Sequence, residues 1–212
     1  MTTKQKAKLV YDELKRLYPN AECTLYHEGD AWRLLVMARL SAQCTDARVN
    51  IVSKTLFKEI PDVYSMANAE QSRVEELIKS CGLYRTKAKS LCEMSRQLVE
   101  RFDGQVPDDF DSLMSLSGVG SKIANLMLGD LFGKGGIVAD THCIRITNRL
   151  GLVKGKNQSV VERTLSPLLP KEIQSDFCHM IVEFGRDVCT ARNPKCDDCP
   201  MKEKRLCKGV KE

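Results

Sequence analysis

The sequence contains no long hydrophobic run, which argues against a membrane protein. No uninterrupted apolar stretch approaches the ~20 residues that a membrane-spanning helix needs. The first eight residues, Met-Thr-Thr-Lys-Gln-Lys-Ala-Lys, lack the apolar segment of a secretory signal. We therefore expect a cytoplasmic protein without a membrane partner.

Histidine and charge of one sign are also scarce. The three histidines, His27, His142 and His179, are too dispersed to predict a metal site. The net charge of +5 is mild, so it permits an anionic partner such as nucleic acid but does not require one. Long period-two alternation, low-complexity segments and internal repeats are absent. The 212 residues are enough for one domain or two small ones.

Cysteine, in contrast, is abundant, and four of the ten cysteines lie close together near the C-terminus. Cys189, Cys196, Cys199 and Cys207 are separated by six, two and seven residues. Because no export signal is present, disulfides are not expected. Four thiolates in a short charged loop are typical of a tetrahedral zinc site or an iron–sulfur cluster. The spacing alone does not distinguish the two.

Apolar residues recur with the helical period along most of the chain, which predicts an all-α fold. Two capping-box sequences, Ser72 with Glu75 and Ser159 with Glu162, predict helix starts. The glycine-rich segment 133–136 predicts a joint between two helical lobes, with a cleft at that joint. The expected helices cover approximately 10–18, 31–40, 49–60, 74–78, 88–102 and 173–184.

Residues 113–128 contain a candidate phosphate-binding turn, Gly118-Val119-Gly120, between two short helices. Glycines let a ligand approach the main chain closely, and the N–H groups at a helix start suit an anion. An ordinary corner between helices would also explain the glycines. Lys122, one residue inside the second helix, favours a helix-hairpin-helix that grips a nucleic-acid phosphate.

Several motifs occur in the order typical of one family. They are Leu40–Asp46, Gly82-Leu83-Tyr84 with Lys87-Ala88, Leu116–Lys122, Val138–His142 with Arg145, Asn148 and Arg149, and the four-cysteine loop. On these motifs the chain resembles endonuclease III, the iron–sulfur DNA glycosylase of the helix-hairpin-helix superfamily, over essentially its whole length. The resemblance implies that the four cysteines hold a [4Fe–4S] cluster. It also implies a six-helix barrel over 22–134 and a cluster domain made of 1–21 with 135–212.

The resemblance further implies a bifunctional DNA glycosylase and abasic-site lyase that removes oxidised pyrimidines from duplex DNA. Lys122 would attack the sugar C1′ and carry the sugar as a Schiff base before β-elimination. Asp140 would stabilise positive charge on the sugar or activate the nucleophile. The residues alone leave two other readings open, Asp140 as a helix N-cap and Lys122 as a phosphate contact. We expect Lys122 to be partly buried near its helix N-terminus.

By the same resemblance, Gln43 and Leu83 would fill the space left when a nucleotide leaves the base stack. The other DNA contacts implied by the resemblance are Gly118, Val119, Gly120, Ser121, Arg192 and Lys195. The chain departs from the family at three places. Seven residues, not the usual five, separate Cys199 from Cys207, and Ser117 and Ser121 stand where proline and arginine are common.

Two alternative functions use the same fold. A monofunctional mismatch glycosylase is disfavoured because, by resemblance, those branches carry serine or tyrosine in place of Lys122. A non-catalytic iron–sulfur protein that binds DNA or senses redox state would not need Lys122 and Asp140 together. We expect a monomer whose partner is double-stranded DNA containing damaged pyrimidines or abasic sites.

Overall fold

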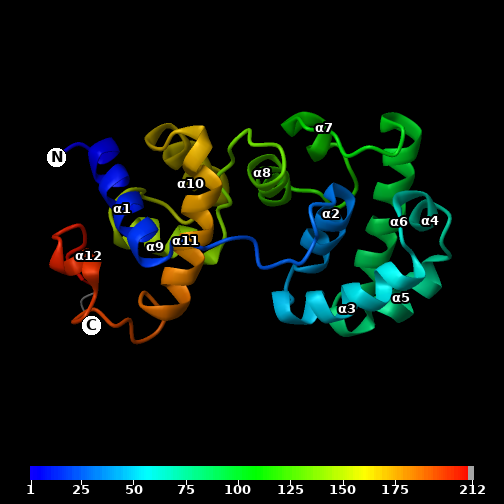
Figure 1. Cartoon of the computed structure of the whole chain (residues 1–212), viewed down its shortest axis with the longest axis horizontal. Helices are drawn as coiled ribbons and strands as arrows, with labels where there is room; N and C mark the ends of the chain where they lie inside the picture. Colours follow the sequence, from blue (N-terminus) through cyan, green and yellow to red (C-terminus); the bar gives the residue numbers. More distant parts are fainter. Residues whose placement is uncertain (210–212) are drawn as a thin grey trace. The chain divides into compact units, whose positions relative to one another are not determined.

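The computed structural model describes residues 1–209, and α-helices with short 3₁₀ turns make up its regular structure (Figure 1). No strand occurs in that range, so the predicted all-α class is confirmed. The chain divides into two compact units, one of residues 24–131 and one of 1–23 with 132–212. None of the described helices is both long and apolar enough to cross a membrane.

The unit of residues 24–131 is assembled around the long helix α6. Its elements are α2 (Ala31–Leu40), α3 (Asp46–Glu59), α4 (Val63–Ala67), α5 (Gln71–Ile78), η1 (Lys79–Cys81), α6 (Tyr84–Phe102), α7 (Phe110–Met114) and α8 (Ser121–Asp130). Helices α2, α4 and α5 all pack against α6. Helix α2 buries nearly its whole surface, as its dense apolar sequence predicts.

The other unit joins the two ends of the chain. Its elements are α1 (Thr3–Leu17), α9 (Thr141–Arg149), α10 (Gln158–Leu165), η2 (Ser166–Leu168), η3 (Lys171–Ile173), α11 (Gln174–Asp187) and α12 (Pro200–Glu203). Helix α1 packs against α11 and α12, and α9 packs against α11 (Figure 1). Val10 and Leu14 of α1 belong to the same buried core as Ile146 and Phe184.

Both predicted capping boxes are wrong. Helix α5 begins at Gln71 after Glu70, which makes no side-chain cap, and α10 begins after Asn157, whose side chain accepts the Val160 N–H. The capping box that does form, Thr2 with Gln5, precedes α1. A capping-box sequence fixes a helix start only when its first residue takes an extended backbone, and Ser72 and Ser159 lie one residue inside their helices.

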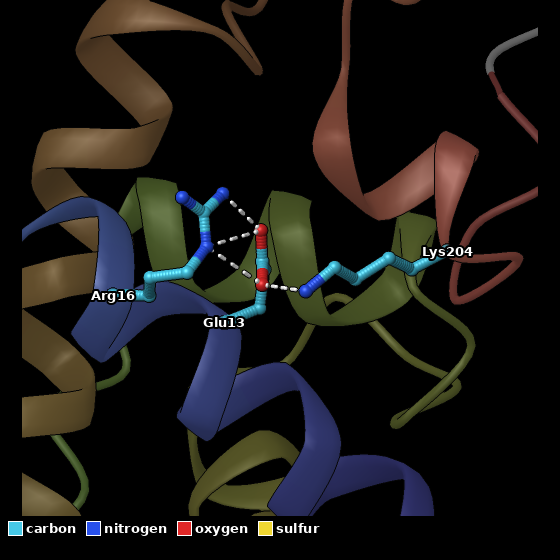
Figure 2. Close-up of polar contacts among 3 residues, drawn as sticks. All are labelled: Glu13, Arg16 and Lys204. Atoms are coloured by element: carbon cyan, nitrogen blue, oxygen red, sulfur yellow. Dashed lines mark hydrogen bonds and ion pairs between the residues drawn. The ribbon is translucent and has the colours of Figure 1, made fainter.

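A buried carboxylate connects the two ends of the chain within the second unit (Figure 2). Glu13 of α1 is only 3% exposed. It accepts a hydrogen bond of 2.7 Å from Arg16, and it pairs with Lys204, which directly follows α12. The hydrogen bond from Arg16, more than that from Lys204, holds the pKa of Glu13 below its usual value. Helix α1 is thereby attached to the segment that carries the last cysteines.

We expect Glu13→Gln to lower the free energy of unfolding at pH 7 by about 1–2 kcal/mol, since charge-assisted hydrogen bonds are lost. A carboxylate with a depressed pKa stabilises the fold fully above its ordinary value of 4.5. That stabilisation is lost as the pH falls from there through the folded-state pKa. In urea denaturation, the difference in free energy of unfolding between wild type and Glu13→Gln should therefore be constant from pH 7 to 5.5. The difference should shrink below pH 4.5.

Asp12→Asn is the matched control for this experiment. Asp12 lies beside Glu13 and forms an exposed pair with Lys8 at 3.0 Å, so its loss should cost less than about 0.5 kcal/mol. Equal costs for the two variants would contradict a stabilising role specific to Glu13.

Candidate functional site

The Gly118-Val119-Gly120 turn joins α7 to α8 as the sequence predicts. Val119 donates its N–H to the Leu116 carbonyl at 3.2 Å and closes the turn. Val119 is buried and presents no side chain to solvent. Helix α8 begins after Gly120, which has no side chain to cap it, and Gly118 and Gly120 are both exposed. The exposed surface of the turn is therefore main chain, which suits a phosphate.

The two glycines have different reasons to be glycine. Gly118 has a φ of 79°, and a Cβ there would lie 2.5 Å from Arg39 Nε and 2.9 Å from Ser90 Cβ. Gly120 has an ordinary φ of −113°. A Cβ at Gly120 would meet nothing within 4 Å. The fold therefore requires glycine at position 118. At position 120 the fold would accept a side chain, so only a ligand that approaches the main chain there would require glycine.

We expect Gly118→Ala to lower the free energy of unfolding by about 1–3 kcal/mol, because the left-handed conformation and the contact with Arg39 both oppose a side chain. Gly120→Ala should leave stability within about 0.5 kcal/mol of wild type. It should nevertheless weaken duplex DNA binding about tenfold, since a methyl group would stand between the backbone and the phosphate. Fluorescence anisotropy and thermal melts measure the two effects. A Gly120→Ala protein with unchanged affinity would show that DNA does not approach this point.

Lys122 is the second residue of α8 and is exposed, so the expectation of partial burial is wrong. Its neighbour Ser121 is half-buried. The apolar side of α8 carries Ala124 and Met127 into the core and so directs the opposite side of the helix, with Lys122, outward. An amine at this position is accessible to a substrate sugar.

Asp140 forms a helix N-cap in the other unit. Its Oδ1 accepts the Cys143 N–H at 2.7 Å at the start of α9. The side chain is half-buried. Among the described residues Oδ2 has no hydrogen-bond partner, so one carboxylate oxygen caps the helix while the other remains available. The cap interpretation is confirmed, and it is compatible with a chemical role.

Gln43 and Leu83 share an unusual backbone conformation. Gln43 lies in the turn between α2 and α3 with a φ of 55°, and Leu83 precedes α6 with a φ of 46°. Both are exposed, and Leu83 retains 58% of its surface in solvent. Left-handed non-glycine residues cost free energy and tend to occur at functional sites. An exposed leucine held in this conformation fits a wedge better than a core residue.

The four cysteines line a single cavity together with apolar residues from α9 and α11, including Ile146 and Phe184. Within residues 1–209 no three His, Cys, Asp or Glu side chains are arranged to hold one metal ion. Sulfurs around one zinc would lie about 3.8 Å apart, because each Zn–S bond is about 2.3 Å long. In a cubane each thiolate binds a different iron, so the sulfurs are farther apart. Four thiols that line one cavity suit a [4Fe–4S] cluster, in which each thiolate binds its own iron.

Two arginines of α9 hold the first cysteine in place. Arg145 donates to the Cys189 carbonyl at 3.0 Å, and Arg149 donates to the Cys189 Sγ at 3.3 Å and to the Thr190 carbonyl at 2.7 Å. Both arginines belong to the motif that begins at Val138 and includes Asp140. The helix that Asp140 caps is thus bonded directly to the cluster loop.

Helix α12 accommodates the longer interval between Cys199 and Cys207. It forms one turn inside that interval, after which the N–H groups of Leu206 and Cys207 return to the Met201 carbonyl. Met201 and Leu206 are buried and anchor the turn. The two extra residues therefore do not displace Cys207 from the cavity.

The two basic residues predicted to contact DNA from this loop differ. Arg192 is exposed, and its main-chain carbonyl accepts a hydrogen bond from Thr190 Oγ1 at 2.7 Å, which leaves the guanidinium directed to no acceptor among residues 1–209. Lys195 is also exposed, but it pairs with Asp187 at 3.3 Å. Arg192 is therefore more available to an external phosphate than Lys195.

Lys87 belongs to a family motif but is not among the site residues that the sequence predicts. Lys87 is 1% exposed on the face of α6 that carries Leu91 and Met94 into the core. A lysine at that spacing on an apolar stripe is the signal that could have identified it. His142, the second residue of α9, lies with its Nδ1 3.2 Å from Arg145 Nη2.

Comparisons with known proteins identify the family of this chain. Residues 36–171 match the family model described as "HhH-GPD superfamily base excision DNA repair protein", and residues 189–203 match the "Iron-sulfur binding domain of endonuclease III". Endonuclease III of Synechocystis sp. is 42% identical over 93% of this chain and 90% of that protein. Endonuclease III of Bacillus subtilis is 42% identical over 90% of this chain and 87% of that protein.

Solved structures are similar over nearly the full length. A trapped endonuclease III–DNA covalent intermediate superposes with a TM-score of 0.91 at 39% identity, covering 98% of this chain and 97% of that one. A thermostable thymine-DNA glycosylase superposes with a TM-score of 0.88 at 22% identity, covering 98% and 97%. The second likeness extends to the fold alone.

Proposed function

We infer the function of this chain from the premise that it belongs to the endonuclease III family of base excision DNA repair proteins. It is a DNA glycosylase with abasic-site lyase activity, it binds DNA, and it contains a [4Fe–4S] cluster, for which we propose Cys189, Cys196, Cys199 and Cys207 as ligands. The finer assignments, namely the residues that act, the preferred lesion, the monomeric state and the cytoplasmic location, are our proposals. We propose oxidised pyrimidines in duplex DNA, and abasic sites, as substrates.

The proposed reaction begins when the damaged nucleotide leaves the stack. Gln43 and Leu83 enter the vacated space, and the backbone of the Gly118–Gly120 turn grips a neighbouring phosphate. Cys189, Cys196, Cys199 and Cys207 would hold the cluster, which when bound would link the two ends of its loop. The Arg192 guanidinium adds a phosphate contact from the cluster loop.

The chemistry is then carried by Lys122 and Asp140. The neutral Lys122 amine attacks C1′, and the base departs with the electrons of the glycosidic bond and a proton. The Asp140 carboxylate stabilises the positive charge that develops on the sugar. Opening of the sugar ring gives an imine between Lys122 and C1′. Loss of a C2′ proton then expels the 3′ phosphate by β-elimination, and water hydrolyses the imine to release the protein.

The observation that carries this proposal is the exposed amine of Lys122 in the first turn of an uncapped helix, directly after a turn whose outer surface is backbone. Borohydride reduction of the imine tests it. The wild-type protein should become covalently joined to duplexes containing thymine glycol or an abasic site, and not to undamaged duplexes. Base release from those duplexes without any trapped adduct would favour a monofunctional glycosylase.

A further inference from the structure

Lys87 is a buried cation whose partners are main-chain carbonyls. Its Nζ donates to the Leu40 carbonyl at 2.8 Å and to the Cys81 carbonyl at 2.7 Å. No carboxylate pairs with it in the described part of the chain. Burial lowers the pKa of the Lys87 amine. Burying a lysine without an opposite charge costs free energy of folding. We therefore expect Lys87 to contribute something to function that an apolar residue at this position could not.

These two carbonyls belong to the last residues of α2 and η1. Each of these elements is followed by a loop that carries a proposed wedge residue, Gln43 or Leu83, and we call these two segments the wedge loops. Leu40 is the last residue of α2, three positions before Gln43. Cys81 is the last residue of η1, two positions before Leu83. The backbone N–H of Lys87 also donates to the Leu83 carbonyl at 3.1 Å. Lys87 is thus hydrogen-bonded to the main chain beside both loops.

These loops need such support because their backbones are strained. Gln43 and Leu83 both have positive φ values, and neither side chain is buried enough to stabilise its own conformation. A strained residue persists only where its surroundings hold it there. The Lys87 ammonium also faces the carbonyl end of α2, where a positive charge is favourable.

The same contacts continue to the hairpin. Ser90 Oγ donates to the Lys87 carbonyl at 2.9 Å, and Arg39 Nε donates to Ser90 Oγ at 2.8 Å. Arg39 and Ser90 are the two side chains that Gly118 closely approaches. Within the unit of residues 24–131, hydrogen bonds therefore connect the Gln43 and Leu83 loops with Arg39 and Ser90, which lie close to Gly118 of the phosphate-binding turn.

We propose that Lys87 is a positioning residue for base extrusion, which fixes the Gln43 and Leu83 loops at the separation needed to enter the duplex together. This inference rests on the wedge roles given to Gln43 and Leu83 in the proposed function. Lys87 itself touches neither DNA nor the reacting atoms.

The test uses the full chain with its cluster and the variant Lys87→Met, which keeps the length of the side chain but removes the donor. Single-turnover excision from a thymine glycol duplex should fall about 100-fold, since misplaced groups cost rate steeply. A 2-aminopurine beside the lesion should report the loss of extrusion through its fluorescence. Cleavage of an abasic site in single-stranded DNA, which needs no extrusion, should change less than about twofold.

Met94→Ala is the matched control, because Met94 is fully buried two turns farther along α6 and its truncation destabilises the same unit without touching the loops. If this control reduces duplex excision as much as Lys87→Met does, the role of Lys87 is merely structural and the proposal is wrong. If Lys87→Met does not fold, Lys87→Gln serves instead, since its neutral amide can still bond one carbonyl. It should then show a smaller loss with the same selectivity for duplex substrate.

A double-mutant cycle provides the second arm. In a background that carries both Gln43→Ala and Leu83→Ala, Lys87→Met should cost less than about threefold, because both side chains through which Lys87 acts are already absent. Additive losses would overturn the proposal. If wild-type protein forms no borohydride adduct with a duplex that contains an abasic site, the proposed function itself fails. If the adduct forms in all variants and only the duplex effect is missing, this inference alone fails.

Discussion

Lys122→Gln should abolish both the borohydride adduct and strand cleavage, with the rate of cleavage falling by at least about 1000-fold. Glutamine has nearly the same length and cannot form an imine. The substitution lies at an exposed position in the first turn of α8, so it should leave the fold and its melting temperature nearly unchanged. Adduct yield on denaturing gels and single-turnover cleavage of an abasic duplex measure the effect.

Lys122→Gln removes both a nucleophilic amine and a positive charge, so a control must distinguish the two effects. Lys89→Gln removes the same charge from an exposed position on α6 and should retain wild-type adduct yield. Binding of lesion duplex by Lys122→Gln should weaken only slightly, and the slope of affinity against salt should change by about one phosphate contact or less. A Lys122→Gln protein that still forms the adduct at wild-type yield would place the nucleophile at another residue.

Asp140→Asn should slow base release by about 100- to 1000-fold while keeping the fold intact. Asparagine retains an oxygen that can accept the Cys143 N–H, so α9 should remain capped. The negative charge, however, is lost, and with it the stabilisation of the cationic sugar. The single-turnover rate of base release should therefore fall strongly, whereas the melting temperature should remain almost unchanged.

Asp140→Ala completes the comparison. It removes the charge and the cap together, so it should add a loss of about 1 kcal/mol in stability to the same loss of rate. If Asp140→Asn releases base as fast as wild type, the aspartate is a helix cap and nothing more. If both variants are equally unstable, the asparagine has failed to cap and the rates cannot be compared at equal folding.

The sequence by itself determined the all-α class, because apolar residues at the helical period require helices wherever they bury a face. It also determined the order of motifs that resembles the family, from Leu40–Asp46 to the cysteine loop. Helix starts were less certain. Ser72 and Ser159 had the expected neighbours for a cap, yet Glu70 and Asn157 occupy the N-cap positions, since backbone conformation at the boundary depends on the packing of the whole helix.

Two residues of the same type can be required for different reasons, one by the packing of the fold and the other by a ligand. The sequence does not distinguish the two cases, but the three-dimensional contacts do. Gly118 and Gly120 look alike in sequence, but only Gly118 is closely approached by Arg39 and Ser90. Lys87 and Lys122 are both lysines early in a helix, yet one is buried against two carbonyls and the other is exposed. The physical reason is that burial and hydrogen bonding are set by residues distant in the chain. A local pattern can specify a helix, but it cannot specify what will lie against each of its faces.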